Sequence, residues 1–350
     1  MLGRSLVAGA GRRVIGYSRT HPVYSTVFEE HPPAGFVYYR TPRWRPLRSL
    51  HALAWNRICL FHHDASAQLP PLPDNVPVVV SCEGRPHDRF FSDPRVRHVF
   101  VHSRWAGGDR LERGEVELLR LAPPIQRPRA SRRNRNEIVI LAVGLGGMVK
   151  GLDVAIRAFE ALRVRFPIRL IIAGALGHNA EWYPEISLDA YKRIDFDELG
   201  RRVQADDRIT LRQFTRRELL RAVYPRADIY LQLSRMDTYP FALLEAMSFG
   251  LPIVATRLNS IPEMVRDGET GFLIDHDGLD MNSADWADRA VVQTESALER
   301  LLMDPALRQR MGDASRARLG AAFDIDYARA RLAQAYTQIL GTGGSRPAHA

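Results

Sequence analysis

Two carboxylates with seven residues between them mark the part of the chain best equipped for chemistry. Asp237 follows an apolar run at 229–233 that predicts a buried strand, and Glu245 lies in a predicted apolar helix over 241–249. A second apolar run at 253–256 completes a strand, loop, helix and strand, which is typical of parallel sheets whose ligands bind at the strands' carboxyl ends. Because an ionised carboxylate only accepts hydrogen bonds, the pair suits neighbouring hydroxyl groups. The alternative is that Asp237 belongs to a turn and Glu245 to a solvated helix face.

A glycine-rich stretch earlier in the chain offers a different chemistry. Residues 141–153 read LAVGLGGMVKGLD, with glycines between a predicted strand at 138–143 and a predicted helix at 152–165. Glycine lets the backbone approach a phosphate closely, and the N-terminus of a helix adds partial positive charge. Gly144 and Lys150 are therefore candidate phosphate-binding residues. The alternative for Lys150 is an ordinary exposed lysine.

Together these segments resemble the retaining glycosyltransferases of family 4, the group 1 type, which have the GT-B fold. The family pattern has two acids with seven residues between them, then Ala-Met and Gly-Leu-Pro, matched here by Asp237, Glu245, Ala246-Met247 and Gly250-Leu251-Pro252. The resemblance implies that Asp237 contacts the hydroxyls of the donor sugar and that Glu245 holds the ribose hydroxyls of a nucleotide diphosphate. The family usually has glutamate at the first position, so Asp237 reaches one methylene less far, which bears on the sugar preferred.

Further matches extend the implied donor site. Val143-Gly144 and Lys150-Gly151 fit a Val-Gly-Arg and Lys-Gly pattern, but Leu145 stands where arginine is usual. Glu263 matches a family glutamate that either faces the donor or only satisfies the N-terminus of its helix, and Asn259 and Ser260 stand where glycines are common. The implied donor-binding residues are Gly144, Lys150, Asp237, Thr238, Glu245 and Glu263. The implied catalytic residues are Glu83, Lys150 and Asp237.

The N-terminal half resembles the family less closely. Residues 58–64, ICLFHHD, look like the family's strand that ends in histidines, which would place His62 and His63 on the acceptor side. Residues 76–84 look like a strand that usually ends in His-Gly near the reacting carbon, and Glu83 stands in place of that histidine. A carboxylate there could take the acceptor's proton or stabilise positive charge on the sugar ring. The alternatives are structural histidines and a turn residue without chemistry.

Alternating strands and helices predict an α/β protein, and the resemblance implies two Rossmann-like domains that face a central cleft. Further strands are expected at 13–17, 35–39, 58–61, 76–81, 96–101, 116–121, 168–173 and 209–211. Further helices are expected at 216–225, 285–302, 305–322 and 326–340, and an irregular insertion at 179–200. The expected parts are an N-terminal acceptor-side domain (1–128), a basic linker (129–136), a nucleotide-sugar-binding domain (137–322), a helix crossing back to the first domain (323–340) and a disordered tail (341–350).

Composition places the chain among soluble globular proteins, with 45% hydrophobic and 25% charged residues. No run approaches the ~18 apolar residues of a membrane-spanning helix, and the N-terminal apolar stretch is short for a signal peptide. Cys59 and Cys82 suggest neither a disulfide framework nor a zinc site, so a reducing cytoplasm is expected.

The chain also contains an Asp-x-Asp sequence, Asp195-Phe196-Asp197, the form found in metal-dependent glycosyltransferases of another fold. It lies in a polar insertion and not at a strand end. We expect no metal and no cofactor, because Lys150 and a helix end can neutralise a departing diphosphate.

The net charge of +9 indicates an anionic partner. Residues 40–57, RTPRWRPLRSLHALAWNR, interleave arginines with Trp44, Trp55 and leucines. Such a segment can lie on an anionic membrane surface, bind RNA by charge and stacking, or form a solvated helix with one buried face. Because no nucleic-acid-binding motif accompanies it, we expect no nucleic-acid partner.

The resemblance therefore implies a metal-independent hexosyl- or related transferase that moves a sugar from a nucleotide-diphosphate sugar to a hydroxyl acceptor with retention of configuration. A glycan, lipid-linked or small-molecule acceptor is expected, in cell-envelope or lipid-linked glycan synthesis, with the protein in the cytoplasm or at the inner face of the membrane. The alternatives are a sugar-nucleotide-binding protein without activity and a GT-B sugar-nucleotide epimerase.

Overall fold

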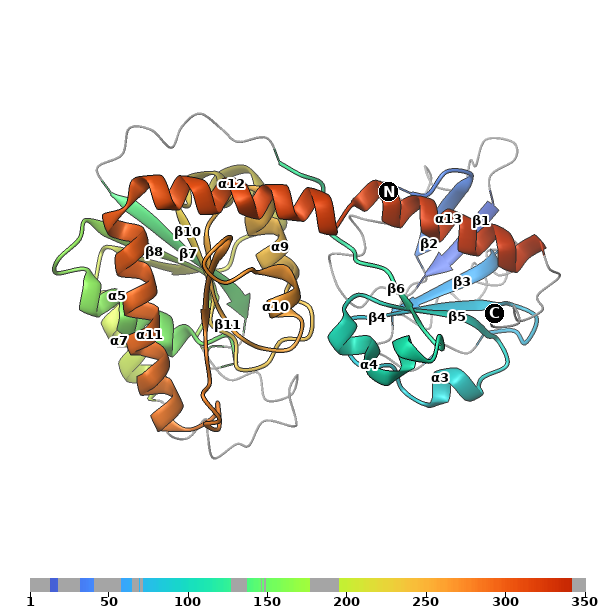
Figure 1. Cartoon of the computed structure of the whole chain (residues 1–350), viewed down its shortest axis with the longest axis horizontal. Helices are drawn as coiled ribbons and strands as arrows, with labels where there is room; N and C mark the ends of the chain where they lie inside the picture. Colours follow the sequence, from blue (N-terminus) through green and yellow to red (C-terminus); the bar gives the residue numbers. More distant parts are fainter. Residues whose placement is uncertain are drawn as a thin grey trace. The chain divides into compact units, whose positions relative to one another are not determined.

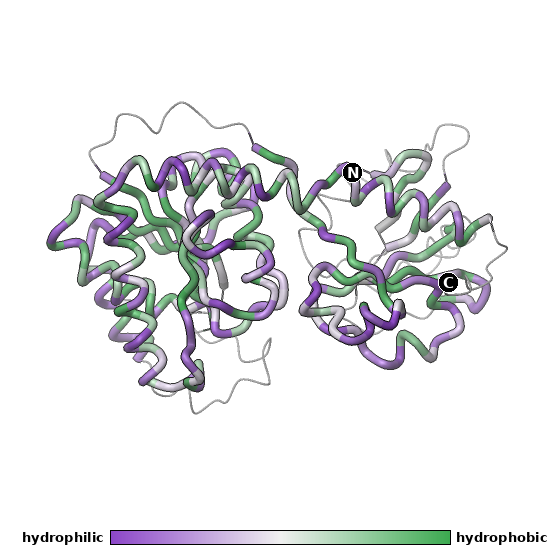
Figure 2. Tube along the Cα trace, viewed as in Figure 1, coloured by the Kyte–Doolittle hydropathy of each residue, from purple (hydrophilic) through white to green (hydrophobic). Residues whose placement is uncertain are grey.

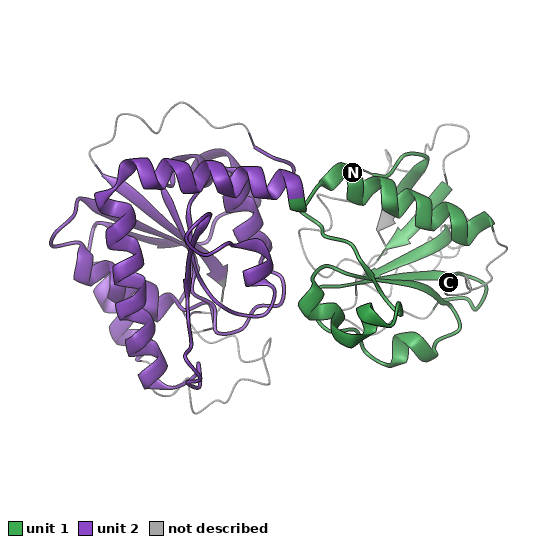
Figure 3. Ribbon diagram, in the orientation of Figure 1, with its two compact units in different colours: residues 1–123, 322–350 green, residues 124–321 purple. Residues whose placement is uncertain are grey.

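The computed structural model forms two compact units, each built on a parallel sheet (Figure 1, Figure 3). Unit 1 comprises Met1–Pro123 and Ala322–Ala350, and unit 2 comprises Pro124–Ala321. The structure describes residues 13–17, 32–40, 58–64, 69, 72–126, 137–145, 147, 149–176 and 195–341.

Unit 1 contains a six-stranded sheet with the order β2-β1-β3-β4-β5-β6, in which every pairing is parallel. Its strands are β1 (Arg13–Tyr17), β2 (Phe36–Arg40), β3 (Ile58–Asp64), β4 (Val78–Cys82), β5 (Val96–Val101) and β6 (Glu117–Leu118). Its described helices are α3 (Arg89–Ser92), α4 (Arg104–Glu112) and α13 (Ile325–Gly341). All five residues of β4 are buried, as expected for a strand covered on both faces.

Unit 2 contains a second parallel sheet with the order β12-β11-β10-β7-β8-β9. Its strands are β7 (Ile138–Leu145), β8 (Ile168–Ala175), β9 (Ile209–Arg212), β10 (Ile229–Gln232), β11 (Ile253–Thr256) and β12 (Gly271–Ile274). Its main helices are α5 (Leu152–Leu162), α7 (Phe196–Ala205), α9 (Phe241–Ser248), α10 (Ile261–Met264), α11 (Ala284–Met303) and α12 (Pro305–Ala322).

Hydrophobic residues concentrate along the strands of unit 2, and the surrounding helices alternate in polarity (Figure 2). Helices α5 and α11 lie on one side of this sheet and α9 and α10 on the other (Figure 1). In α5, apolar residues at helical spacing bury one face against the core, while Arg157 and Glu160 remain on the other. The predicted α/β class with two parallel sheets is therefore confirmed.

Two local expectations are wrong. Residues 179–200 were expected to be irregular; 179–194 lie outside the described residues, but α7 begins at Phe196, with the Asp195 carboxylate accepting a hydrogen bond from the Glu198 amide at 2.8 Å as its N-cap. The single helix expected over 216–225 consists of α8 (Arg216–Glu218), a π-helical turn (Leu219–Val223) and a 3-10 turn (Tyr224–Arg226). Pro225 carries no amide hydrogen and so cannot continue an α-helix.

The predicted linker at 129–136 and residues 342–350 of the tail predicted at 341–350 lie outside the described residues, and Gly341 is the last residue of α13. The predicted crossing segment at 323–340 corresponds to α13, which belongs to unit 1 although it is the last helix of the chain. The expected cleft between the two domains stays a prediction.

Buried polar contacts attach α13 to the sheet of unit 1. The Tyr336 hydroxyl lies 2.8 Å from that of Tyr38 and 2.5 Å from His62 Nδ1, and His62 Nε2 lies 2.7 Å from Ser81 Oγ. Burial, together with the charges of neighbouring histidines, lowers the pKa of His62 to about 3. Burial also lowers the pKa of His102 to about 4. The hydrogen bond from His102 Nδ1 to the Leu119 carbonyl raises this pKa, but by less than burial lowers it. Both rings are therefore neutral at pH 7.

Unit 1 should lose stability when the pH falls through the ordinary histidine range. His62 and His102 take up protons near pH 6.5 when unfolded but only near pH 3 and 4 when folded, so acid favours the unfolded chain. Each histidine should cost about 2 kcal/mol of unfolding free energy between pH 7 and pH 5. Urea unfolding at the two pH values measures this.

Single substitutions test whether the loss of stability in acid comes from His62 and His102. His102→Gln should reduce the acid-induced loss by about half, because His62, the other histidine whose pKa is lowered to this extent, remains. His87→Gln, which alters an exposed histidine, should follow the wild type. Equal unfolding free energies at pH 7 and pH 5 in the wild type would contradict this account.

Candidate functional site

The turn between β7 and α5 has the local geometry that Lys150 requires. A β-carbon on Gly144 would lie 2.7 Å from the Lys150 Cγ, so the lysine stem occupies space that only glycine leaves open. Gly151 has φ +66°, and a β-carbon there would lie 1.9 Å from the Leu233 carbonyl oxygen. The turn therefore lies directly against the end of β10, the strand paired with β7.

A buried ion pair joins this turn to the loop after β10. The Arg235 guanidinium donates two hydrogen bonds of 2.7 Å to the Asp153 carboxylate, and both side chains are almost fully buried. Arg235 also donates from Nε to the Met281 carbonyl at 2.9 Å, and its amide donates to the Val149 carbonyl at 2.8 Å. Its guanidinium lies 4.6 Å from the ring centroid of Trp286. This bidentate geometry fixes the two loops in one register.

Lys150 and Asp237 meet at the place these loops define. Lys150 Nζ lies 2.7 Å from Asp237 Oδ2, with 16% and 12% of the two side chains exposed. Two residues that follow β11 hold the backbone of the Asp237 loop. Asn259 Nδ2 donates to the Asp237 carbonyl at 2.8 Å, and Ser260 Oγ donates to the Thr238 carbonyl at 2.6 Å. The structure thus brings together four residues of the predicted donor site, namely Gly144, Lys150, Asp237 and Thr238.

Glu245 lies in α9, the helix that follows the Asp237 loop. Its Oε1 accepts from Arg216 Nε and Nη2 at 3.0 and 2.9 Å, and its Oε2 accepts from the Tyr224 hydroxyl at 3.0 Å. Only 5% of the residue is exposed. Burial raises the pKa of the Glu245 carboxyl, and the Arg216 charge and the hydrogen bonds from Arg216 and Tyr224 act in the opposite direction. The carboxylate is oriented by these two partners before any ligand binds.

Glu263, the remaining predicted donor-side acid, is half-buried in the first turn of α10. The Arg318 guanidinium donates to the carbonyl oxygens of Glu263 and Met264, so α12 holds the C-terminal end of this short helix. The position is compatible with either role expected for Glu263, and the choice between them stays a prediction.

The predicted residues of unit 1 form a different environment. Glu83 follows β4 directly and is half-buried at the carboxyl end of that strand. His62 is 2% exposed and hydrogen-bonded as described, and His63 is fully buried with its ring 6.0 Å from that of Phe90. The burial of both histidines favours the structural interpretation, and their acceptor-side role stays a prediction.

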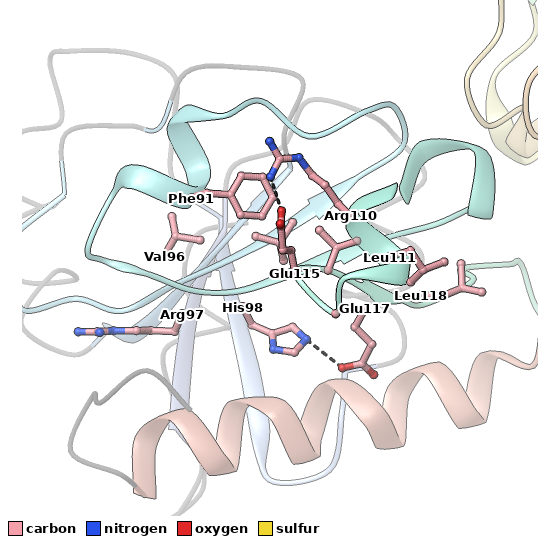
Figure 4. Close-up of a pocket in the computed structure, with 12 residues that line it drawn as sticks. Phe91, Val96, Arg97, His98, Arg110, Leu111, Glu115, Glu117 and Leu118 are labelled. Atoms are coloured by element: carbon pink, nitrogen blue, oxygen red, sulfur yellow. Dashed lines mark hydrogen bonds and ion pairs between the residues drawn. The ribbon is translucent and has the colours of Figure 1, made fainter. Parts of the chain in front are cut away.

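A cavity of about 650 Å³ in unit 1 contains none of the predicted site residues. It lies beside β5 and β6, and Figure 4 shows an apolar lining that includes Phe91 and Leu111. His98 Nε2 contacts Glu117 at 2.9 Å within it, and Arg110 contacts Glu115. These polar residues are paired with one another, so the cavity offers no reactive group comparable to Lys150.

Sequence reasoning missed the partners of the predicted residues, above all Arg216, Arg235 and Asp153. Each is a common residue type whose role depends on a contact far along the chain. The scarcity of lysine singles out Lys150, because Lys150 and Lys192 are the only two in the chain, but it gives no signal for these three partners.

Neither a metal cluster nor a membrane span is found in the described part of the chain. No group of three or more histidine, cysteine, aspartate or glutamate side chains there could hold an ion. Asp195 of the Asp-x-Asp sequence caps α7 instead. Within the same residues, no helix is long and apolar enough to cross a membrane.

Comparisons with known proteins agree on one family. The model of the family "Glycosyl transferases group 1" matches residues 126–318, more than half of the chain. A D-inositol 3-phosphate glycosyltransferase of Pseudarthrobacter chlorophenolicus is 31% identical over 179 residues, which are 50% of this chain and 37% of that protein. An α-D-kanosaminyltransferase of Streptomyces kanamyceticus is 26% identical over 202 residues, 57% of this chain and 46% of that protein. The chain thus matches less than half the length of these relatives.

Solved structures extend the likeness to both units. Sucrose-phosphate synthase from Thermosynechococcus elongatus superposes with a TM-score of 0.66 at 17% identity, covering 95% of this chain and all of that one. An Anabaena protein solved in complex with UDP and glucose gives a TM-score of 0.63 at 13% identity, covering 93% and 99%. These likenesses confirm the GT-B fold class. The family match over residues 126–318 shows that this chain belongs to the group 1 glycosyltransferases.

Proposed function

We propose that the chain is a retaining glycosyltransferase that moves a sugar, of the hexosyl or a related type, from a nucleotide-diphosphate sugar to a hydroxyl acceptor. The observation that carries this proposal is the contact between Lys150 and Asp237 at the carboxyl ends of β7 and β10. It places a cation suited to phosphate beside a carboxylate suited to sugar hydroxyls. Such a combination matches the two ends of the bond that a glycosyl donor must break.

The proposed step breaks the bond between the anomeric carbon and the diphosphate oxygen, and forms a bond from the acceptor oxygen to the same face of the sugar. The acceptor's proton passes to an oxygen of the departing diphosphate, which leaves with the bonding electron pair. Lys150 carries a full positive charge at this turn, so it can stabilise the negative charge that develops on the diphosphate. Glu83 is proposed as the carboxylate nearest the reacting carbon in unit 1.

The nucleotide is proposed to bind with its ribose at Glu245. Support comes from the fixed orientation of this buried carboxylate, which Arg216 and Tyr224 hold from the protein side. The diphosphate would lie at the Gly144–Lys150 turn and the N-terminus of α5, where the helix end adds partial positive charge. Since these groups already supply positive charge, the proposed reaction needs no metal ion.

The acceptor is proposed to be a lipid-linked or cell-envelope glycan. Residues 40–57 motivate this, and 41–57 of them lie outside the described residues. The segments 41–57 and 127–136 together contain nine arginines and no acidic residue. The excess basic charge of the chain is therefore concentrated in these two segments, which favours a localised anionic partner over a uniformly basic surface.

A second candidate is a sugar-nucleotide-binding protein without transferase activity. Leu145 favours it, because the family's usual arginine at that position would supply a second phosphate cation. Incubation with a panel of labelled nucleotide sugars separates the two candidates. Slow donor hydrolysis or transfer supports the enzyme, while binding without turnover supports the second candidate. Conversion of the donor sugar to its epimer would instead indicate an epimerase.

Replacing Glu245 should weaken binding of the bare nucleotide diphosphate. A charge-assisted hydrogen bond contributes about 1.5–3 kcal/mol, so Glu245→Ala should raise the Kd by one to two orders of magnitude in calorimetry. Glu160→Ala is the matched control, because Glu160 is held by an arginine fork from Arg202 in α7, away from the predicted site. Unchanged nucleotide affinity in Glu245→Ala would remove this residue from the ribose site.

Replacing Lys150 should lower turnover more than donor binding. If its charge acts mainly as the diphosphate departs, Lys150→Ala should reduce kcat by about 100-fold with a small change in KM. Lys192→Ala removes the other lysine and serves as the control. Wild-type activity should also survive EDTA. A normal kcat with only a raised KM in Lys150→Ala, or full loss in EDTA with recovery on adding manganese, would contradict the proposed role.

Anionic membranes should bind the chain through residues 40–57. Each basic residue near an anionic surface contributes about 1 kcal/mol, so Arg43, Arg45 and Arg48 together should shift partitioning by about two decades. Co-sedimentation with anionic and neutral vesicles tests this, comparing the wild type with a triple Arg→Glu variant at low and high salt. Equal pelleting of both proteins would assign this segment a role other than membrane attachment.

A further inference from the structure

A buried hydrogen-bond chain leads from the sheet of unit 2 to the Asp237 carboxylate. The Tyr230 hydroxyl donates to Gln232 Oε1 at 2.8 Å, and Gln232 Nε2 donates to Asp237 Oδ2 at 3.1 Å and to Ser234 Oγ at 2.7 Å. Ser234 Oγ lies 3.4 Å from the same Asp237 oxygen. Tyr230, Gln232 and Ser234 are all at most 3% exposed, so water cannot replace these contacts at low cost.

The chemistry of its neighbours fixes the orientation of the Gln232 amide. Asp237 is acceptor-only when ionised, so the amide NH₂ must face it. Burial, and then the nearby charges of Asp237 and Glu245, raise the pKa of Tyr230 well above its ordinary value, so this hydroxyl keeps its proton and donates to Gln232 Oε1. A flipped amide would place its carbonyl oxygen against the carboxylate and its NH₂ against the tyrosine hydrogen. Two acceptors and two donors would then face each other, and neither pair would form a hydrogen bond.

The two oxygens of Asp237 are consequently unequal. Oδ2 accepts from Lys150 and Gln232 and is within reach of Ser234. In the described part of the chain, no donor is recorded on Oδ1, and 12% of the Asp237 side chain is exposed. One oxygen is therefore committed to the protein, and the other remains available to a ligand.

We propose that Gln232 and Ser234 are positioning residues that hold Asp237 Oδ2 and thereby direct Oδ1 at a hydroxyl of the donor sugar. The proposal rests on the proposed function and adds a determinant of donor selectivity to it. A carboxylate held in this way accepts from a hydroxyl in one direction, so it discriminates between sugars that differ in the position of that hydroxyl. A carboxylate free to rotate accepts from either epimer.

The central test compares donor selectivity in the wild type and in Gln232→Leu. The panel of UDP-, GDP- and dTDP-sugars first identifies the best and second-best donors of the wild type. Loss of the Gln232 hydrogen bonds should lower kcat/KM for the best donor by about tenfold and narrow its advantage over the second donor by a similar factor. Calorimetric affinity for the bare nucleoside diphosphate should stay within about twofold, because Glu245 is held by separate partners.

Two further variants separate positioning from general damage. Tyr230→Phe deletes one oxygen and should move selectivity in the same direction by a smaller factor, in case Gln232→Leu folds poorly. Gln293→Leu is the matched control, because this glutamine bonds the Asp275 amide and carbonyl away from the site. It should lower the Tm without changing the ratio between donors. An unchanged ratio in both Gln232→Leu and Tyr230→Phe would overturn the proposal.

A ligand-free measurement distinguishes failure of this inference from failure of the proposed function. Residues that contact each other give non-additive effects on stability. The Tm losses of Gln232→Leu and Asp237→Ala should therefore not add in the double variant, whereas those of Gln293→Leu and Asp237→Ala should. Additive losses for Gln232 and Asp237 would overturn the inference even if the wild type transfers sugar. Non-additive losses without turnover of any donor would retain the Gln232–Asp237 contact, and would overturn both the proposed activity and its selectivity.

Discussion

The ion pair between Arg235 and Asp153 is the contact on which the geometry of the candidate site depends. Lys150 and Asp237 come from loops 87 residues apart in the chain, and neither loop has regular secondary structure of its own. Arg235 connects them through two hydrogen bonds to Asp153 and through its amide to Val149. Loss of one partner of such a buried pair leaves an unpaired charge and costs about 3–5 kcal/mol. That penalty keeps the loops together.

The same constraint explains the glycines of the turn. With the two loops tied, the Leu233 carbonyl lies where a β-carbon at position 151 would stand, and the Lys150 stem lies where one at position 144 would stand. The glycines therefore permit the close approach that Arg235 enforces. Of these two glycines, only Gly151 is also needed for its backbone conformation, because its φ of +66° disfavours other residues.

The sequence predicted the parts that depend on local patterns. Short apolar runs located the strands, and the seven-residue spacing located Asp237 and Glu245, because both patterns are properties of neighbouring residues. The predictions were weaker where distant residues decide the outcome. Nothing near Glu245 in the sequence indicates that Arg216 and Tyr224 hold it, and nothing near Asp237 indicates the bond from Lys150.

Sequence alone also left some roles open. The Asp-x-Asp form at Asp195 was set aside as a metal site because it lies in a polar insertion, and the structure shows that its side chain caps α7. Aspartate serves both purposes, and only the position of the Glu198 amide three residues later separates them. In the same way, the sequence left a structural and an acceptor-side role open for His62 and His63, and the rings packed beneath α13 and against Phe90 favour the structural role.

The predicted nucleotide and sugar contacts are held by separate sets of partners. Arg216 and Tyr224 hold Glu245, whereas Lys150 and Gln232 hold Asp237. No hydrogen bond recorded among the described residues joins the two carboxylates. Because the two carboxylates share no hydrogen-bond partner among the described residues, we expect a change at the Asp237 network to alter sugar preference more than nucleotide affinity. Asp237 Oδ2 lies 2.7 Å from Lys150 Nζ and 3.1 Å from Gln232 Nε2, so the position of this carboxylate depends on both the phosphate-side turn and the end of β10.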